Sequence, residues 1–308
     1  MFLNENSFNV FLTETCPILH PSVKTRIAQP VGWSANYTMN FFQVGEFVRF
    51  FRAAVTKYQL HSPFVFDLAC AVLEDKRWYY AFGEVESMRQ KMLASEVALN
   101  VTDFGIGHSA RPKKRSVRSM ARLAGSSKEQ GRMLFRMANH LGPKKMLELG
   151  TSVGIGAMYL SSAVRDAQFI SLEGSPEVAQ VARLNLEWMG LDKHASVWEG
   201  PFEQRLLPAL QTLQRLDLVF FDGNHRPEPT LGYFEACLAY SHEKTAFVFD
   251  DMHGSAGMSE AWEQLKNHPR VTLTIDFFEL SVVFIDPDFR EKQHLKIVPA
   301  RWKPWRFF

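Results

Sequence analysis

Two short acidic sequences suggest where the chemistry of this chain lies. Asp222-Gly-Asn-His225 follows the apolar run LDLVFF, and Asp250-Asp251-Met-His253 follows TAFVF. If both runs are neighbouring parallel strands, Asp222, Asp250 and Asp251 would converge at their carboxyl ends. Three converging carboxylates cannot all stay ionised without a compensating cation. Oxygen ligands of this kind predict Mg²⁺, Mn²⁺ or Ca²⁺, and the alternative is that the aspartates cap helices and turns, with Asp222 also touching a cofactor.

Two histidines beside these acids add groups that can accept a proton near neutral pH. His225 follows the first acidic sequence and His253 follows the second. A single loop histidine is more often structural, but a histidine beside each acidic cluster favours a role in the chemistry. We therefore predict His225 as general base, with Asp222 next to it in the catalytic group and His253 as a second candidate.

A glycine-rich turn precedes these residues, in KMLELGTSVGIGAMYLS over residues 145–161. Gly150, Gly154 and Gly156 lack a Cβ, so the backbone there can turn sharply and approach a ligand closely. A strand that runs into such a turn and a helix is the usual nucleotide cradle of an α/β sheet, and an ordinary tight turn is the alternative. The G-x-x-x-G-x-G spacing differs from that of dinucleotide binders. Glu148 fits a cationic amino group, such as that of S-adenosylmethionine (SAM), better than it fits a pyrophosphate.

Further cofactor contacts are expected at the ends of the next two strands. Glu173 lies 23 residues after Gly150, where an acid that accepts hydrogen bonds from ribose hydroxyls is expected. A helix N-terminal charge is the alternative for Glu173. Gly200 and Phe202 would border an adenine ring, although Phe202 is equally a candidate for the core. Thr151, directly after the first glycine, completes the predicted cofactor set.

The elements that must position these residues alternate regularly along the chain. Alternation of strands and helices predicts a Rossmann-like α/β fold with a seven-stranded, mostly parallel sheet and an antiparallel C-terminal hairpin. Ser126 is the expected cap of the first helix, with Glu129 as its capping-box partner. The predicted strands are 145–149, 168–173, 195–199, 216–222 and 245–250, with a final hairpin over 271–278 and 280–285. The predicted helices are 126–140, 176–189, 204–213, 230–240 and 259–267, with another starting at Ile155.

The N-terminal part of the chain has a different character. Residues 1–38 show no clear period and are predicted as a loose arm. Residues 39–125 are predicted as an aromatic-rich helical accessory or lid segment, with helical spacing over 41–58 and a helix start at Ser62-Pro63. Residues 126–308 form the predicted main domain. A second glycine-rich stretch over 101–109, with Asp103, competes with the first, but a basic run over 111–118 follows it and a loop is the favoured interpretation.

Composition restricts the class of protein. The chain has 308 residues, 46% of them hydrophobic, and a net charge of +2. This length suffices for one large domain with an accessory segment, and the charge gives no global attraction to nucleic acid or anionic membranes. Cys16, Cys70 and Cys237 match no metal or disulfide spacing, so a cytoplasmic location is expected. No apolar run reaches a membrane-spanning length of about 18 residues, and the N-terminus does not resemble a secretory signal.

The sequence from about Ser126 to Ile285 resembles the class I SAM-dependent methyltransferases. ELGTSVGIG is similar to the first motif of the family, ISLEGS to the second and LVFFDGNH to the fourth. DGNH and DDMH resemble the small-molecule O-methyltransferase branch, which is related to the catechol and caffeoyl-CoA enzymes. In that branch an Asp and an Asp-Asn pair hold Mg²⁺; Asp222, Asp250 and Asp251 match these positions, with Asp251 in place of the Asn. HSPFVF, DDMHGSAGM and KQHLKI also resemble a bacterial group of such proteins, a match that names no substrate.

The resemblance implies an enzyme that transfers a methyl group from SAM to a hydroxyl group of a small molecule, with a divalent cation lowering the pKa of that hydroxyl. The branch has a catalytic Lys three residues after its first Asp, where this chain has His225. Two alternatives stay open: an RNA methyltransferase that uses the basic run over 111–118, and a non-catalytic protein of the same fold. The near-zero net charge counts against RNA. The sequence does not define the acceptor, the metal or the oligomeric state.

Overall fold

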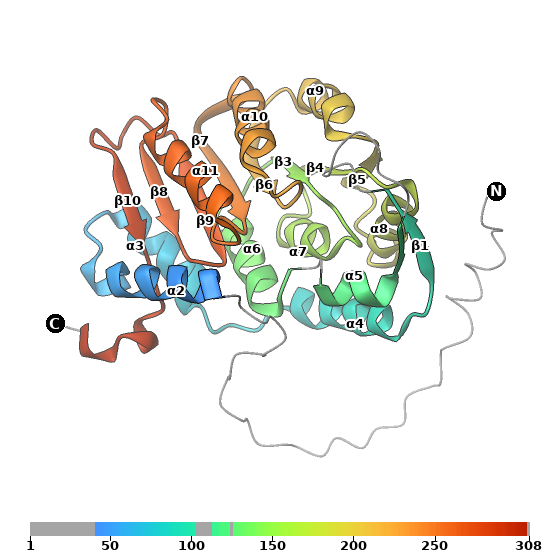
Figure 1. Cartoon of the computed structure of the whole chain (residues 1–308), viewed down its shortest axis with the longest axis horizontal. Coiled ribbons are helices and arrows are strands. Elements are labelled where there is room, and N and C mark those ends of the chain that lie inside the picture. Colours follow the sequence, from blue (N-terminus) through green and yellow to red (C-terminus); the bar gives the residue numbers. More distant parts are fainter. Residues whose placement is uncertain (1–40, 103–112, 124–125, 307–308) are drawn as a thin grey trace, which may run out of the picture. The chain divides into compact units, whose positions relative to one another are not determined.

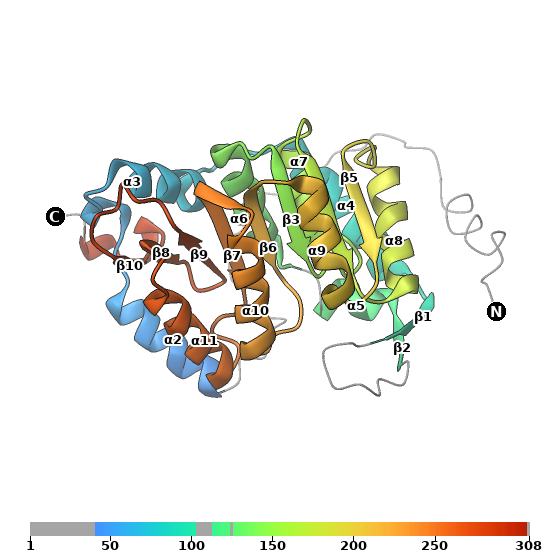
Figure 2. The ribbon, with the colours of Figure 1, turned by 90° about the horizontal axis from the view of Figure 1, so that it is seen from above.

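A computed structural model describes residues 41–102, 113–123 and 126–306 of the chain. Its centre is an eight-stranded sheet in the order β10-β8-β9-β7-β6-β3-β4-β5, with β10 and β5 at the two edges (Figures 1 and 2). All neighbouring strands are parallel except β7–β9 and β8–β9, which are antiparallel. The strands are β3 (Lys145–Leu149), β4 (Gln168–Glu173), β5 (Ala195–Glu199), β6 (Leu216–Phe221), β7 (Ser241–Asp250), β8 (Leu273–Asp276), β9 (Leu280–Phe284) and β10 (Gln293–Lys296).

Helices cover both faces of this sheet. Leu147 and Leu149 of β3 point to a buried core shared with α9, α10 and α11. Because successive side chains of a strand alternate between faces, Glu148 points the other way, to the layer that contains α6 and α7 (Figure 1). The helices of the sheet region are α6 (Lys128–Leu141), α7 (Ile155–Ala163), α8 (Pro176–Trp188), α9 (Phe202–Leu213), α10 (Pro227–Leu238) and α11 (Ala256–Asn267).

The central strands are apolar because both of their faces are covered. In β6, Leu218, Val219 and Phe220 are each at most 1% exposed. Phe221 and Phe249, at the ends of β6 and β7, stack with 4.5 Å between ring centroids. This packing fixes the two strand ends that carry the acidic sequences side by side.

The N-terminal helices confirm part of the predicted pattern. The described elements here are α2 (Phe41–Ala53), α3 (Pro63–Ala69), α4 (Tyr80–Ala94) and α5 (Val117–Leu123), with the short helices η1 (Lys57–Gln59) and η2 (Cys70–Glu74). Ser62 caps α3 as predicted, its side chain accepting a hydrogen bond from the Val65 N–H at 3.4 Å. The helix predicted over 41–58 ends at Ala53, because the Val55 N–H donates instead to the Lys296 carbonyl at 2.8 Å.

Other differences from the prediction are local. The strand β10 is an addition to the seven predicted strands, and Ala98–Val101 (β1) pairs with Lys113–Ser116 (β2) in a separate two-stranded sheet. The basic run is therefore partly strand, and the rest of the second glycine-rich stretch, from residue 103, lies outside the described residues. The cap of α6 is Ser127 with Gln130, not Ser126 with Glu129. Two short 3₁₀ turns, η3 (Ala300–Trp302) and η4 (Pro304–Arg306), follow β10.

The predicted domain boundaries are not all accessible to the structure. The described residues form one compact unit in which α4 packs against α7. The predicted division into an accessory segment up to residue 125 and a main domain from residue 126 therefore stays a prediction. The arm predicted over residues 1–38 lies outside the described residues.

Candidate active site

The glycine turn after β3 brings two strand ends into contact. Gly150 has φ +108°, and a Cβ placed there would lie 2.3 Å from the carbonyl oxygen of Asp222. The N–H groups of Gly150 and Thr151 both donate to the Leu172 carbonyl, at 3.0 and 3.1 Å. Gly150 is therefore required for close approach, but the group approached in the structure is the backbone of Asp222, directly after β6; its predicted approach to a ligand stays a prediction.

Glu148 lies beneath this turn, not in it. Its side chain is fully buried, and its Oε2 accepts a hydrogen bond from the Ser171 hydroxyl. A Cβ on Gly156 would lie 2.7 Å from Oε1, so that glycine makes room for the carboxyl group. Burial raises the pKa of Glu148 to about 8. The predicted direct contact with a cofactor amino group is not supported by this burial, which follows from the alternation of side chains along β3.

Thr151 and Glu173 hold the loop from the β4 side. The Thr151 hydroxyl, also buried, is hydrogen-bonded to the Ser171 hydroxyl. The half-buried Glu173 carboxylate accepts the Ser152 N–H at 2.8 Å and the Ser175 N–H at 2.9 Å. Glu173 thus stands at the strand end where the sequence expects it, and its role toward a ribose stays a prediction.

The predicted adenine-side residues lie on the next strand and helix. Gly200 has φ +126° and its N–H donates to the Glu173 carbonyl at 2.9 Å. Phe202 begins α9, and its ring packs 5.7 Å from that of Tyr233. A Cβ on Gly223 would meet the Phe202 ring at 2.8 Å, so Phe202 lies directly over the loop after β6. Contact of Gly200, Phe202 and Gly154 with a cofactor stays a prediction.

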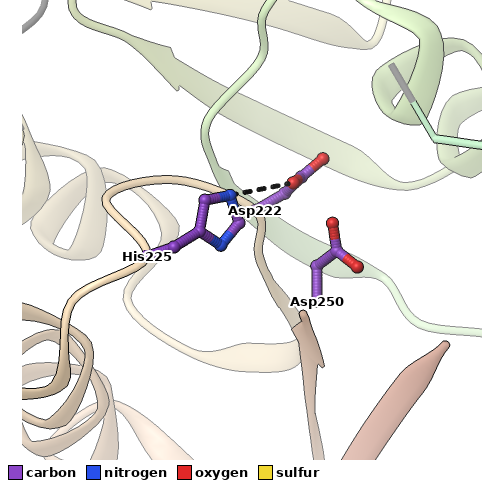
Figure 3. A group of neighbouring side chains, drawn as sticks. All are labelled: Asp222, His225 and Asp250. Atoms are coloured by element: carbon purple, nitrogen blue, oxygen red, sulfur yellow. Dashed lines mark ion pairs between the residues drawn. The ribbon is translucent and has the colours of Figure 1, made fainter. Parts of the chain in front are cut away.

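Two predicted acids and a histidine come together after β6 and β7 (Figure 3). Asp222, His225 and Asp250 each offer one donor atom, and these three atoms lie within 4.8 Å of one another. The His225 Nε2 is 3.9 Å from Asp222 Oδ1, and the His225 side chain is 43% exposed against 14% for Asp222. The structure therefore brings three of the residues singled out in the sequence to one point.

In the part of the chain that the structure describes, the two carboxylates of this group are not paired with a lysine or arginine side chain. Burial and the neighbouring Asp250 carboxylate raise the pKa of Asp222 well above its usual range. Burial and then the charge of Asp251 raise the pKa of Asp250. Among the described residues, no Lys or Arg forms an ion pair with Asp222 or Asp250. Such a site favours the uptake of a proton or of a cation.

Two members of this site escaped the sequence interpretation. The Gln130 side-chain amide donates a hydrogen bond to Asp250 Oδ1. Glu279, in the turn between β8 and β9, accepts a hydrogen bond from the Ser127 hydroxyl at 3.4 Å, and burial raises its pKa to about 7. A capping box assigned to Ser127 and Gln130 would have placed Gln130 in the first turn of α6. The sequence around Glu279 contains no pattern that predicts a place in this site.

Two predicted residues fall outside the group. Asp251 is exposed and its carboxylate is not among the three close donors, although its N–H donates to Asp250 Oδ1 at 2.8 Å. His253 is 6% exposed, and its Nε2 lies 2.9 Å from Asp276 Oδ2. The His253 ring stacks on Phe278 at 4.9 Å. This burial disfavours His253 as a base open to an acceptor, because the turn after β7 directs its ring toward Phe278 and Asp276; its catalytic role stays a prediction.

Comparison with known proteins agrees with this architecture. Residues 147–252 match the family model described as a methyltransferase domain. A catechol O-methyltransferase of Mycobacterium tuberculosis is 29% identical over 138 residues, which is 43% of this chain and 59% of that protein. Catechol O-methyltransferase B of Danio rerio is 32% identical over 98 residues, 30% of this chain and 37% of that protein.

A solved structure extends the likeness in fold. The SAH-bound methyltransferase PaMTH1 of Podospora anserina superposes with a TM-score of 0.51 at 17% identity, covering 74% of this chain and 97% of that one. Residues 147–252 are thus similar to a methyltransferase domain, which confirms the predicted resemblance to the class I methyltransferases. The chain spans less than two thirds of the length of the two curated relatives named above. Within the described residues, every helix is too short or too polar to cross a membrane.

Proposed function

We propose that this protein is a SAM-dependent methyltransferase that methylates a hydroxyl group of a small molecule with the help of a divalent cation. One observation carries the proposal. The glycine turn lies directly against the strand end that carries Asp222, because Gly150 packs on the backbone of that residue. A cofactor on the turn would therefore have its reactive end beside Asp222 and Asp250, at the carboxyl ends of the strands where α/β proteins bind their ligands.

The chain's own residues would hold and orient the two reactants. Glu173 would accept hydrogen bonds from the ribose, and Phe202, over the loop after β6, would border the adenine. When bound, SAM supplies a methyl group on a sulfonium, which makes it electrophilic. The protein then contributes mainly by positioning the acceptor oxygen in line with that methyl group.

A divalent cation fits the residues present. Asp222 and Asp250 are partly buried carboxylates whose pKa values are raised by desolvation and by the neighbouring acids Asp250 and Asp251. When bound there, a cation would lower the pKa of a hydroxyl group. His225 can act either as the proton acceptor or as a third ligand of the cation. The preference of the protein for one metal ion over another distinguishes these two roles. The contribution of Asp251 stays a prediction.

The acceptor is proposed to be a phenol with two adjacent hydroxyl groups. The names of the two curated relatives support this class, since both are catechol O-methyltransferases. The aromatic helix α2 supports an apolar acceptor, because the partly buried rings of Phe47 and Phe278 pack 5.0 Å apart, next to Glu279 in the chain. A small aromatic acceptor could lie against such a wall.

Methyl transfer from radiolabelled SAM tests the proposal. Catechol, a panel of phenols and a metabolite extract are incubated with the protein, with and without EDTA, and Asp250→Asn is assayed beside the wild type. We expect label in a small-molecule product, loss with EDTA and loss in the variant. Label in RNA would favour the alternative that uses the basic run. Calorimetry that detects neither SAM nor SAH binding at millimolar concentration would refute both enzyme functions.

A further inference from the structure

The side chain of His225 is held in an unusual way for a general base. A catalytic histidine is normally oriented by a second hydrogen bond to its other ring nitrogen. In the described part of the chain, the His225 ring has an ion-pair contact with Asp222 at 3.9 Å, which is too long for a hydrogen bond, and no hydrogen bond to any residue. Nothing in this environment therefore fixes its tautomer for proton transfer.

The backbone that carries this ring is, in contrast, well fixed. Asn224, with φ +53°, donates through its side chain to the Tyr233 hydroxyl at 3.3 Å and accepts from Arg226 Nε at 2.9 Å. Gly223 lies against the Phe202 ring. The loop thus presents the imidazole toward Asp222 and Asp250 and leaves the ring itself free to turn (Figure 3).

The distances suit a shared ion. With ligand bonds of about 2.1 Å, two ligands of one octahedral ion are about 3.0 Å apart when adjacent and about 4.2 Å apart when opposite. The 3.9 Å between His225 Nε2 and Asp222 Oδ1 lies between these values, and all three donor atoms lie within 4.8 Å. Small movements of the exposed His225 ring would complete the set.

We infer that His225 is a third metal ligand together with Asp222 and Asp250, and that the site selects a nitrogen-binding transition metal ion over Mg²⁺. The inference takes its location from the proposed function, on which it rests for its role in methyl transfer. Mg²⁺ prefers oxygen ligands and retains several waters, whereas imidazole suits Co²⁺, Ni²⁺ and Zn²⁺. The Lys that the catechol-related enzymes carry at this position cannot serve as such a ligand while protonated. The replacement of that Lys by His225 thus alters which metal ion the site prefers, and it does not replace one catalytic base by another.

Binding of Co²⁺ and Mg²⁺ to the chelator-treated full chain tests this inference without any assay of activity. Calorimetry gives both dissociation constants, and the visible spectrum and proton NMR of the Co²⁺ protein report its ligands. We expect Co²⁺ to bind at least about tenfold more tightly than Mg²⁺. A bound imidazole should add one strongly shifted ring N–H resonance that disappears in D₂O.

Variants assign that resonance. His225→Gln should lose it and bind Co²⁺ about 10- to 100-fold more weakly, with Mg²⁺ affinity changed less than about threefold. His61→Gln, which removes an exposed histidine elsewhere, should leave both metals unchanged. Asp250→Asn should weaken both metals, because it removes a shared oxygen ligand.

Equal loss of Co²⁺ and Mg²⁺ in His225→Gln, persistence of the N–H resonance in that variant, or no metal binding to the wild type would overturn the inference. Calorimetric titration of SAM into the same metal-free protein keeps the two proposals apart. SAM binding without the expected metal selectivity refutes only the ligand role of His225. The expected selectivity without SAM binding refutes only the proposed methyltransferase function.

Discussion

Replacement of Glu148 by Gln should make the protein less sensitive to alkaline pH. Glu148 is fully buried and burial raises its pKa from 4.5 to about 8. The folded state therefore holds the proton more tightly than the unfolded state does. Wild-type stability is unaffected by this group below pH 4.5 and falls as the pH rises from 4.5 toward 8, because folding must then keep a proton that the unfolded chain releases.

The size of the effect follows from the shift. Each pH unit between the two pKa values corresponds to about 1.4 kcal/mol, so the full interval gives an upper limit of about 5 kcal/mol. The Gln side chain has nearly the same shape and no charge to lose. Glu148→Gln and wild type should differ by less than about 1 kcal/mol at pH 5, and the variant should be more stable by about 2–4 kcal/mol at pH 8.

Denaturant unfolding followed by circular dichroism, at pH 5, 6, 7 and 8, measures this difference. Comparison of the variant with the wild type at each pH cancels the titration of all other groups. Glu187→Gln, at an exposed position of α8, is the matched control and should show no trend. A stability difference for Glu148→Gln that is constant across this range would refute the assignment of a raised pKa to this carboxyl group.

Three further predictions concern the turn, the pocket and the cation. Gly150→Ala should lower the free energy of unfolding by more than about 2 kcal/mol and abolish SAM binding, because its Cβ would clash with the Asp222 backbone. Gly232→Ala, in open space on α10, is the control and should be neutral or stabilising in the same unfolding assay. His253→Asn should lower the free energy of unfolding, measured by thermal denaturation, by about 1–3 kcal/mol. The metal affinity measured by calorimetry should not change, because the His253–Asp276 contact lies apart from the metal group, and a loss of metal binding would contradict this. A divalent ion at one fixed concentration should raise the melting temperature of the wild type by more than that of Asp250→Asn, and equal shifts would place the ion elsewhere.

The order of elements could be predicted from the sequence because the local signals agree with the fold. The strands over 168–173 and 195–199 have the predicted bounds, since each apolar run has clear polar limits. The meeting of Asp222 with Asp250 also followed, because β6 and β7 are parallel neighbours whose ends coincide.

Features that depend on distant contacts could not be predicted in the same way. The strand β10 is only four residues long, and its pairing with β8 gives it its conformation. The burial of Glu148 could not be predicted, because the sequence shows an acid two residues before a glycine but not which face of β3 it occupies once Leu147 and Leu149 are buried. Glu279 lies in a hairpin turn whose proximity to Asp250 arises only when the sheet is assembled.

The contact between the two ends of the described chain has a consequence for synthesis. Val55 bridges to Ile297, the Val298 N–H donates to the Val55 carbonyl at 3.0 Å, and the Lys303 ammonium donates to the Ala54 carbonyl at 2.6 Å. The segment after α2 therefore gains these contacts only once residues 297–303 have been synthesised, roughly 10–50 s later at ordinary elongation rates. Phe47 packs on Phe278 and Trp302, which are also synthesised late, so we expect a chaperone that shields the aromatic face of α2 during synthesis to raise the yield of folded protein.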